Sequence, residues 1–152
     1  MSYLDGMKTE FERIPKSAKV DTIFWGGGTP SLLSAKDLQR LGMSMIDNVG
    51  SDFSEWTVEM APSTVKADKL KVLLDLGVTR FSMGIQSFNP DSLEKLGRLH
   101  NLKQIYYAWD LIKESGVYET NVDMMFALPN QDLNDWSEDC LLYTSPSPRD
   151  LS

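Results

Sequence analysis

The stretch "DTIFWGGGTP", residues 21–30, ends a strand-like run at three consecutive glycines, which Thr29 and Pro30 follow. Residues 20–25, "VDTIFW", are rich in β-branched and aromatic side chains and predict a buried strand. Glycine at the tip of a strand allows positive φ angles and leaves bare backbone open to close approach by another group. A tight turn explains the same residues, so the glycines alone leave a structural and a binding interpretation open.

The composition indicates one acidic globular domain. The chain has 152 residues, 41% of them hydrophobic, and a formal net charge of -7. This charge argues against a nucleic-acid-binding surface, which needs clustered Lys and Arg. Cys140 is the single cysteine, which excludes a disulfide framework and a metal site built from cysteines of this chain. No apolar run reaches the roughly 18 residues of a membrane span and no signal peptide is visible after Met1, so we expect a cytoplasmic protein, with a mitochondrial location as the alternative.

Strands and helices are predicted to alternate along the chain. Ser34 is a predicted helix N-cap, with Asp37 in the first turn, and Gly77 is a predicted C-terminal cap. Such alternation favours parallel strands joined by right-handed crossovers. We therefore expect an α/β fold of about four βα units, compatible with half of a (β/α)8 barrel and with an open doubly wound sheet. The predicted strands are 20–25, 56–60, 79–88 and 120–129, and the predicted helices are 3–14, one after Ser34, 66–77, 90–97, 101–116 and one that begins at 132.

The end of the chain breaks this pattern. Residues 141–152, "LLYTSPSPRDLS", are dominated by Ser and Pro, and the helix before them has no predicted end. We therefore divide the chain into a core of residues 1–139 and a tail of residues 140–152, which we expect to be non-native or disordered.

Every predicted strand ends in polar residues or bare backbone, at the edge where parallel α/β sheets bind their ligands. Carboxylates within apolar strands need partners, so we expect Glu59 and Asp123 to pair with Arg98 or His100. Structural interpretations stay open, since Arg98 suits an exposed surface and His100 a hydrogen-bonded packing position. The glycines lack both the G-x-G-x-x-G dinucleotide pattern and the G-K-S/T of a P-loop. The residues at the strand ends are Gly26, Gly27, Gly28 and Thr29 after the first strand, Glu59 in the second, Gln86 in the third and Asp123 in the fourth.

Five segments together resemble a known family. "TIFWGGGTPSLL", "VEMAP", "RFSMGIQSF", "LGRLH" and "NVDMMFALPNQ" occur in this order within residues 20–139. Their order and spacing resemble the radical S-adenosylmethionine proteins of the oxygen-independent coproporphyrinogen III oxidase family. Within that family, "QSF" and "GRLH" look more like the heme chaperone branch than the coproporphyrinogen III dehydrogenases.

The resemblance implies a role in heme or porphyrin metabolism and a partial (β/α) barrel that binds S-adenosylmethionine across its open end. It implies a 4Fe-4S cluster as a second cofactor, heme as a further ligand and a heme-acceptor protein as a partner. It assigns no catalytic residue to this chain. The matching positions are Gly26, Gly27, Gly28 and Thr29 along the methionine moiety, Gln86 and Asp123 as further contacts with Asp123 at the ribose, Arg98 at the ligand's carboxylate, and Glu59 and Gly27 on the side of a second ligand.

The sequence departs from the family pattern at several positions. The three cluster cysteines, a C-x3-C-x2-C run upstream of the glycines, are absent, and Cys140 is the first residue of the expected tail. The resemblance therefore implies a truncated fragment whose Met1 is an internal methionine and which has no radical activity alone. Ala61 stands where Asn or Asp is usual, and Ala127 replaces a usual glycine.

Three other functions stay open for the sequence. One is the oxidative decarboxylation carried out by the coproporphyrinogen III dehydrogenases, and another is heme delivery without turnover. The third is a different α/β barrel enzyme, with the glycine loop binding the phosphate of a metabolite.

Overall fold

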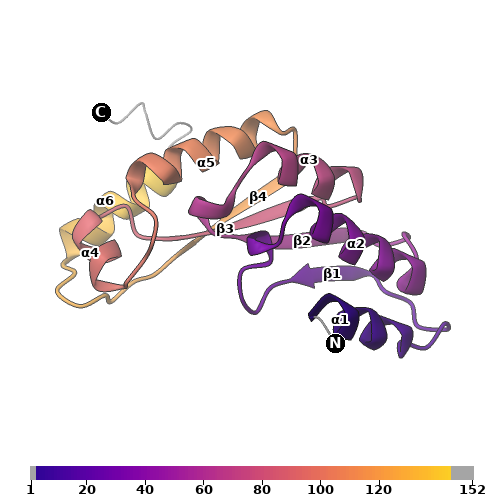
Figure 1. Ribbon diagram of the computed structural model, residues 1–152. Coiled ribbons are helices and arrows are strands. Elements are labelled where there is room, and N and C mark those ends of the chain that lie inside the picture. The colour runs from indigo at the N-terminus through magenta and orange to yellow at the C-terminus, as the bar shows by residue number, and fades with distance from the viewer. Residues whose placement is uncertain (1–2, 145–152) are drawn as a thin grey trace.

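The computed structural model describes residues 3–144, in which four parallel strands form one sheet (Figure 1). The strands follow their chain order across the sheet, β1-β2-β3-β4, and every neighbouring pair is parallel. The expected α/β fold of about four βα units is therefore confirmed. The strands are β1 (Thr22–Trp25), β2 (Glu55–Met60), β3 (Arg80–Gln86) and β4 (Glu119–Met124). The helices are α1 (Tyr3–Glu12), α2 (Ala35–Val49), α3 (Ala67–Asp75), α4 (Pro90–Lys95), α5 (Leu102–Glu114) and α6 (Leu133–Thr144), with the short 3-10 helices η1 (Pro30–Leu32) and η2 (Pro62–Thr64).

The fourth strand is shorter than the sequence predicts. It was expected to reach residue 129, but it ends at Met124. Ala127 has a φ angle of 59°, a left-handed conformation that interrupts extended backbone. The third strand likewise stops at Gln86, whose φ angle is 78°. Apolar patterning does not reveal positive φ angles at residues other than glycine, so both strand ends were predicted too late.

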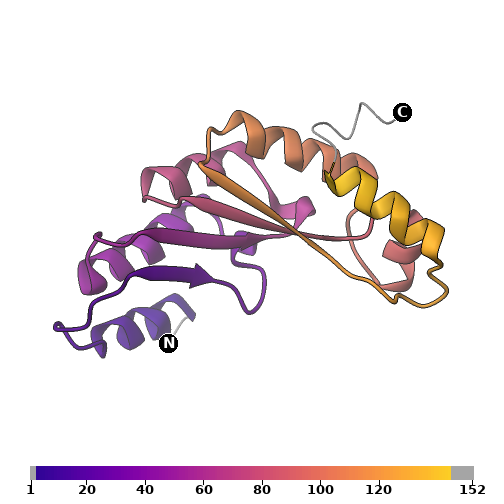
Figure 2. The same cartoon turned by 180° about the vertical axis from the view of Figure 1, so that it is seen from behind.

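Helices α2, α3 and α5 lie along one face of the sheet, as the front and rear views show (Figures 1 and 2). Successive residues of a strand point to opposite faces, so every second side chain turns toward these helices. Val58, Phe81 and Ile85 are such residues, and each is at most 2% exposed within the core. Burial of one apolar side chain of this size contributes about 1.5–3 kcal/mol, so this core holds the helices on the sheet.

The opposite face of the sheet carries polar side chains in register. Glu59 of β2 is paired with Ser82 of β3, and Ser82 is paired with Asn121 of β4. Arg80, two residues before Ser82, forms an ion pair with Glu55 at 3.5 Å. Strand partners in register share a face. Glu59, Ser82 and Asn121 therefore form a polar row across this face of the sheet, near the carboxyl ends of the strands.

The predicted helix caps are present at α2 and α3. The Oγ atom of Ser34 accepts a hydrogen bond from the backbone N–H of Asp37 at 3.1 Å, which satisfies a donor in the first turn of α2. Gly77 follows α3 with a φ angle of 101°, a conformation that glycine adopts readily.

Helix α6 extends past the expected end of the core. It runs from Leu133 to Thr144, so residues 140–144 are helical rather than disordered, and the division of the chain at residue 140 stays a prediction. The rest of the expected tail, residues 145–152, lies outside the described residues. Within residues 3–144, no helix combines the length and the apolar character that crossing a membrane requires.

Candidate functional site

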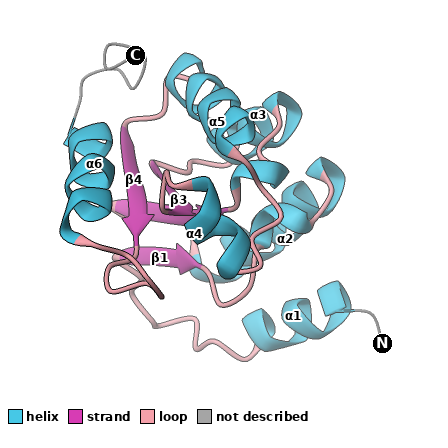
Figure 3. Ribbon diagram, turned by 90° about the vertical axis from the view of Figure 1, so that its left-hand side faces the viewer, coloured by secondary structure: helices cyan, strands magenta, loops and turns pink. Residues whose placement is uncertain are grey.

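A pocket of about 190 Å³ lies at the carboxyl ends of the strands, and we call it the polar pocket. Figure 3 views the molecule from the side toward which β1 points in Figure 1. All four strands, or the loops directly after them, supply lining residues, and the segment between α4 and α5 adds one more. Six of the eight predicted site residues are among them. The polar pocket is lined by Gly28, Thr29, Glu59, Met60, Ala61, Gly84, Gln86, Arg98 and Asp123.

The other two predicted residues, Gly26 and Gly27, line a neighbouring cavity of about 720 Å³ between α1, β1 and α2. This cavity is mostly apolar and shares Gly28 and Thr29 with the polar pocket. The glycine loop, residues 26–29, therefore lies between the apolar cavity and the polar pocket and lines both.

Glycine is favoured at positions 26 and 27 for different reasons. A Cβ atom on Gly26 would lie 2.8 Å from the Cδ atom of Glu59 and 2.7 Å from the Cε1 atom of Phe24. The backbone of Gly26 is thus in direct contact with a carboxylate that lines the polar pocket. Gly27 has open space around it but a φ angle of 82°, which side chains disfavour. Close approach therefore favours glycine at position 26 and backbone conformation favours it at position 27, whereas the structure gives no such reason for Gly28.

Asp123 is held by two neighbours on the polar face of the sheet. The Ser82 hydroxyl donates to its Oδ2 atom at 3.1 Å, and the Asn121 amide donates to its Oδ1 atom at 2.7 Å. The same Asn121 amide also donates to the Ser82 hydroxyl at 3.0 Å. These bonds fix the orientation of an exposed carboxylate at the rim of the polar pocket.

The expected pairing of Glu59 and Asp123 with Arg98 or His100 is wrong. Asp123 has its partners on β3 and β4, as described above, and among residues 3–144 neither Arg98 nor His100 forms an ion pair with either carboxylate. Arg98 is exposed and lines the same pocket as both carboxylates without contacting them at ion-pair distance. Its guanidinium group is therefore available to a ligand.

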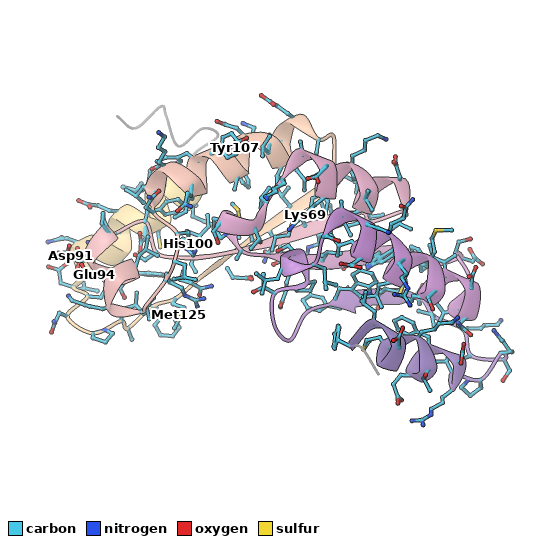
Figure 4. All side chains as sticks on the ribbon, viewed as in Figure 1. Lys69, Asp91, Glu94, His100, Tyr107 and Met125 are labelled. Carbon is cyan, nitrogen blue, oxygen red and sulfur yellow. The ribbon has the colours of Figure 1, made fainter. Side chains whose placement is uncertain are left out.

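His100 is a buried packing residue. It is 6% exposed, and its Nε2 atom lies 3.2 Å from the carbonyl oxygen of Ile85. Burial lowers the pKa of His100, so the ring is neutral near pH 7 and donates its Nε2–H to that carbonyl. Figure 4 shows His100 near the sheet, whereas Asp91 and Glu94 of α4 lie at the far left of the view. The hydrogen-bonded packing interpretation is thus confirmed.

Gln86 has an unusual backbone conformation beside the pocket. Its φ angle of 78° coincides with a register shift between Gly84 and Gln86. A Cβ atom on Gly84 would lie 2.9 Å from the Nε2 atom of Gln86, so the glutamine side chain lies over the glycine. Non-glycine residues in such conformations cost about 1–3 kcal/mol and concentrate at functional sites.

Met60, Ala61 and Gly84 line the polar pocket although they were not among the predicted site residues. The place of Gly84 in the pocket could have been predicted from the sequence. It stands two positions before Gln86 in the same strand, so the two residues share a face, and glycine within a strand often marks close approach.

Lys69 holds the 3-10 helix η1, which directly follows the glycine loop. It lies on α3, is 8% exposed and donates to the carbonyl oxygen of Ser31 in η1. The hydroxyl of Ser31 is in turn hydrogen-bonded to that of Thr64 in η2. Burial is also the main cause that lowers the pKa of Lys69. Figure 4 shows Lys69 between α3 and the sheet, and the sequence contained no signal for this contact.

The chemistry of the polar pocket suits a small zwitterionic ligand. Arg98 offers a cation for a carboxylate, while Glu59 and Asp123 offer acceptors for hydroxyl or ammonium groups. An iron–sulfur cluster does not fit the residues that are present. Within residues 3–144 no group of three or more His, Cys, Asp or Glu side chains is placed to hold a metal ion.

Comparisons with known proteins identify the family. The sequence pattern of the Radical SAM superfamily matches residues 4–142. The heme chaperone HemW of Bacillus subtilis is 42% identical over 137 residues, which are 86% of this chain and 36% of that protein. The heme chaperone HemW of Haemophilus influenzae is 39% identical over 153 residues, which are 98% of this chain and 40% of that protein. Among solved structures, coproporphyrinogen III oxidase (HemN) from Escherichia coli matches with a TM-score of 0.80 and 30% identity over 91% of this chain and 33% of that chain.

The matches cover most of this chain but less than half of each relative. The chain spans 36% and 40% of the two heme chaperones. The family pattern, in contrast, covers almost all the residues that the structure describes. The chain therefore belongs to the Radical SAM superfamily.

Proposed function

We propose that the polar pocket binds S-adenosylmethionine. The observation that carries this proposal is that Gly28, Thr29, Glu59, Gln86, Arg98 and Asp123 line one pocket although they come from four different βα units. In the proposed complex, the Arg98 guanidinium group binds the carboxylate of the ligand. The oriented carboxylate of Asp123 accepts hydrogen bonds from the ribose hydroxyls.

The glycine loop completes this proposed site. Without side chains, Gly26, Gly27 and Gly28 leave their backbone groups open to the amino group and the sulfonium region of the methionine moiety. The polar pocket, at about 190 Å³, is smaller than the about 300–1,000 Å³ of typical small-molecule sites. We therefore propose that it encloses only part of the ligand, and that the rest lies along the glycine loop.

We further propose that the parent protein resembles the heme chaperones and acts in heme or porphyrin metabolism. The higher identity to the two HemW proteins than to the coproporphyrinogen III oxidase structure supports this choice. A 4Fe-4S cluster bound elsewhere in the parent would supply the reductive chemistry of the family. Heme is the proposed cargo, a heme-acceptor protein is the proposed partner, and the cytoplasm is the proposed location.

Equilibrium binding tests the ligand proposal directly. S-adenosylmethionine is titrated into the 152-residue chain in a calorimeter, and into an Arg98→Met variant. A hydrogen bond to a charged group contributes about 1.5–3 kcal/mol, so the variant is expected to bind about tenfold more weakly or worse. Lys103→Met is the matched control, because it removes one exposed positive charge from α5, away from the pocket. Unchanged affinity in Arg98→Met, or no binding by the unaltered chain, would refute the proposal.

Two assays on the parent protein separate the chaperone from the coproporphyrinogen III oxidase. Heme titration followed by absorbance measures stoichiometric heme binding, and product analysis measures decarboxylation of coproporphyrinogen III. The proposal expects heme binding without decarboxylation. Turnover of coproporphyrinogen III would instead support the oxidase, the function named for the Escherichia coli structure. The 152-residue chain alone is expected to cleave no S-adenosylmethionine, because residues 3–144 hold no set of cluster ligands.

A further inference from the structure

Asp139 is a buried carboxylate outside the polar pocket. It lies on α6 and is 2% exposed. Its Oδ2 atom accepts a hydrogen bond from the Ser87 hydroxyl at 2.8 Å, and its Oδ1 atom accepts one from the backbone N–H of Phe88 at 2.7 Å. An ionised carboxylate is costly to bury, so it is retained where donors such as these compensate for the lost water.

The way α6 docks is unusual for an amphipathic helix. A helix that only covers a core buries a stripe of apolar side chains. In α6, by contrast, Asp139 is the one buried residue, whereas Leu133, Leu141 and Tyr143 are exposed. Leu142 packs against the core, but two carboxylates of this helix contact residues 87–89: Asp139, and Asp135, which accepts a hydrogen bond from the side-chain amide of Asn89 at 3.3 Å.

That segment directly follows Gln86. Residues 87–89 leave the sheet immediately after the positive φ angle of Gln86, which lines the polar pocket. On the other side, the Gln86 carbonyl accepts a hydrogen bond from the backbone N–H of Met125 at 2.8 Å. Gln86 is thus held between β4 and a segment that Asp139 fixes in place.

Further hydrogen bonds connect Ser87 to the start of α4, the helix that precedes Arg98. The Ser87 hydroxyl, which donates to Asp139, accepts a hydrogen bond from the backbone N–H of Asn89 at 3.0 Å. Asn89 caps α4 by accepting from the backbone N–H of Ser92 at 3.1 Å, and the chain leads through α4 to Arg98. One buried carboxylate therefore stands at the origin of hydrogen bonds that run to Ser92, and the covalent chain joins this segment to Gln86 at one end and to Arg98 at the other.

We propose that Asp139 is a positioning residue for the polar pocket: it holds residues 87–89 so that Gln86 and Arg98 face the ligand. This proposal rests on the proposed binding of S-adenosylmethionine by the same pocket. Asp139 itself does not line the pocket, so any effect on binding is transmitted through the segment that it holds.

The test compares Asp139→Asn with Glu138→Gln in the 152-residue chain. Both variants lose one negative charge at adjacent positions of α6, but Glu138 is exposed whereas Asp139 is buried. The first readout is the dissociation constant for S-adenosylmethionine, measured well below the unfolding temperature. The second, which needs no ligand, is the three-bond coupling between the amide and α hydrogens of Gln86, because this NMR coupling depends on φ.

Asp139→Asn is expected to bind S-adenosylmethionine about tenfold more weakly and to change the Gln86 coupling. Glu138→Gln is expected to leave both values unchanged. If Asp139→Asn only lowers the unfolding temperature and keeps both values, Asp139 is merely structural and the proposal is overturned. If the unaltered chain binds no S-adenosylmethionine, the proposed function fails, and the Gln86 coupling alone decides whether Asp139 sets the backbone of the pocket.

A second variant covers the case in which Asp139→Asn does not fold. Ser87→Ala removes the hydroxyl that links Asp139 to Asn89 but leaves the bond from Phe88 intact. It is expected to shift both readouts in the same direction by a smaller amount. A Ser87→Ala variant with unaltered coupling and unaltered affinity would overturn the proposal as well.

Discussion

Gln86 offers a case in which stability and binding should change in opposite directions. Its φ angle of 78° is unfavourable for any residue with a Cβ atom. In Gln86→Gly this penalty disappears, while the side chain that lines the polar pocket is removed. We therefore expect the variant to be more stable than the unaltered chain and to bind S-adenosylmethionine less tightly.

The expected gain in stability is small but measurable. A left-handed conformation costs an L-residue about 1–2 kcal/mol, and the greater freedom of glycine in the unfolded chain returns about 0.5–1 kcal/mol of that. The free energy of unfolding should therefore rise by about 1 kcal/mol, and the unfolding temperature by about 2–4 °C for a chain of this size. Loss of one net hydrogen bond of about 1 kcal/mol should weaken binding about fivefold.

Gln86→Ala is the control that separates the two effects. It removes the same side chain but keeps a Cβ atom at a positive φ angle, so it should lose affinity without gaining stability. Thermal unfolding followed by circular dichroism and calorimetric titration measure both quantities on the same samples. If Gln86→Ala is as stable as Gln86→Gly, the backbone at residue 86 is not strained and the reasoning is refuted.

Two further predictions concern residues near the pocket. Ala127→Gly should raise the free energy of unfolding in urea by about 0.5–1 kcal/mol, because Ala127 has a φ angle of 59°; an unchanged or lower value would contradict this. For His100, burial lowers the pKa below the ordinary value of 6.5, so below that pH the unfolded chain binds more protons than the folded protein and stability falls with falling pH. His100→Gln, which can still donate to the Ile85 carbonyl but does not titrate, should reduce this fall as the pH drops below 6.5; an identical pH profile in both proteins would show that another group is responsible.

The sequence predicted which residues lie at the carboxyl edge of the sheet better than it predicted where the strands end or which contacts form there. Alternation of strands and helices was enough to place Glu59, Gln86 and Asp123 at one edge, because the carboxyl ends of parallel strands meet there. The expected partners of Asp123 were wrong: Asn121 stands two residues before it in the same strand, while Ser82 is brought beside it by the register of β3 and β4. Register is fixed by the packing of whole strands and is not visible in one segment.

Side-chain hydrogen bonds between segments far apart in the sequence could not be predicted from it either. The hydrogen bond between Asp139 and Ser87 joins residues 52 positions apart, and that between Lys69 and Ser31 joins residues 38 positions apart. A lone Asp or Lys on a helix normally indicates a solvent-exposed face. The departure at Ala127, where the family pattern has glycine, was informative, because the structure gives this residue a positive φ angle.

The order of the sheet divides the site into two halves. The second unit supports the first where Glu59 lies on Gly26 and where Lys69 holds Ser31, and the fourth unit supports the third where α6 holds residues 87–89. None of these three contacts joins the halves, which meet instead through the pairing of β2 with β3 and the ion pair between Arg80 and Glu55. Paired substitutions at these contacts should therefore give more nearly additive changes in binding free energy when one falls in each half than when both fall in the same half. Directed evolution of a new ligand preference could vary either half while the other is left as it is.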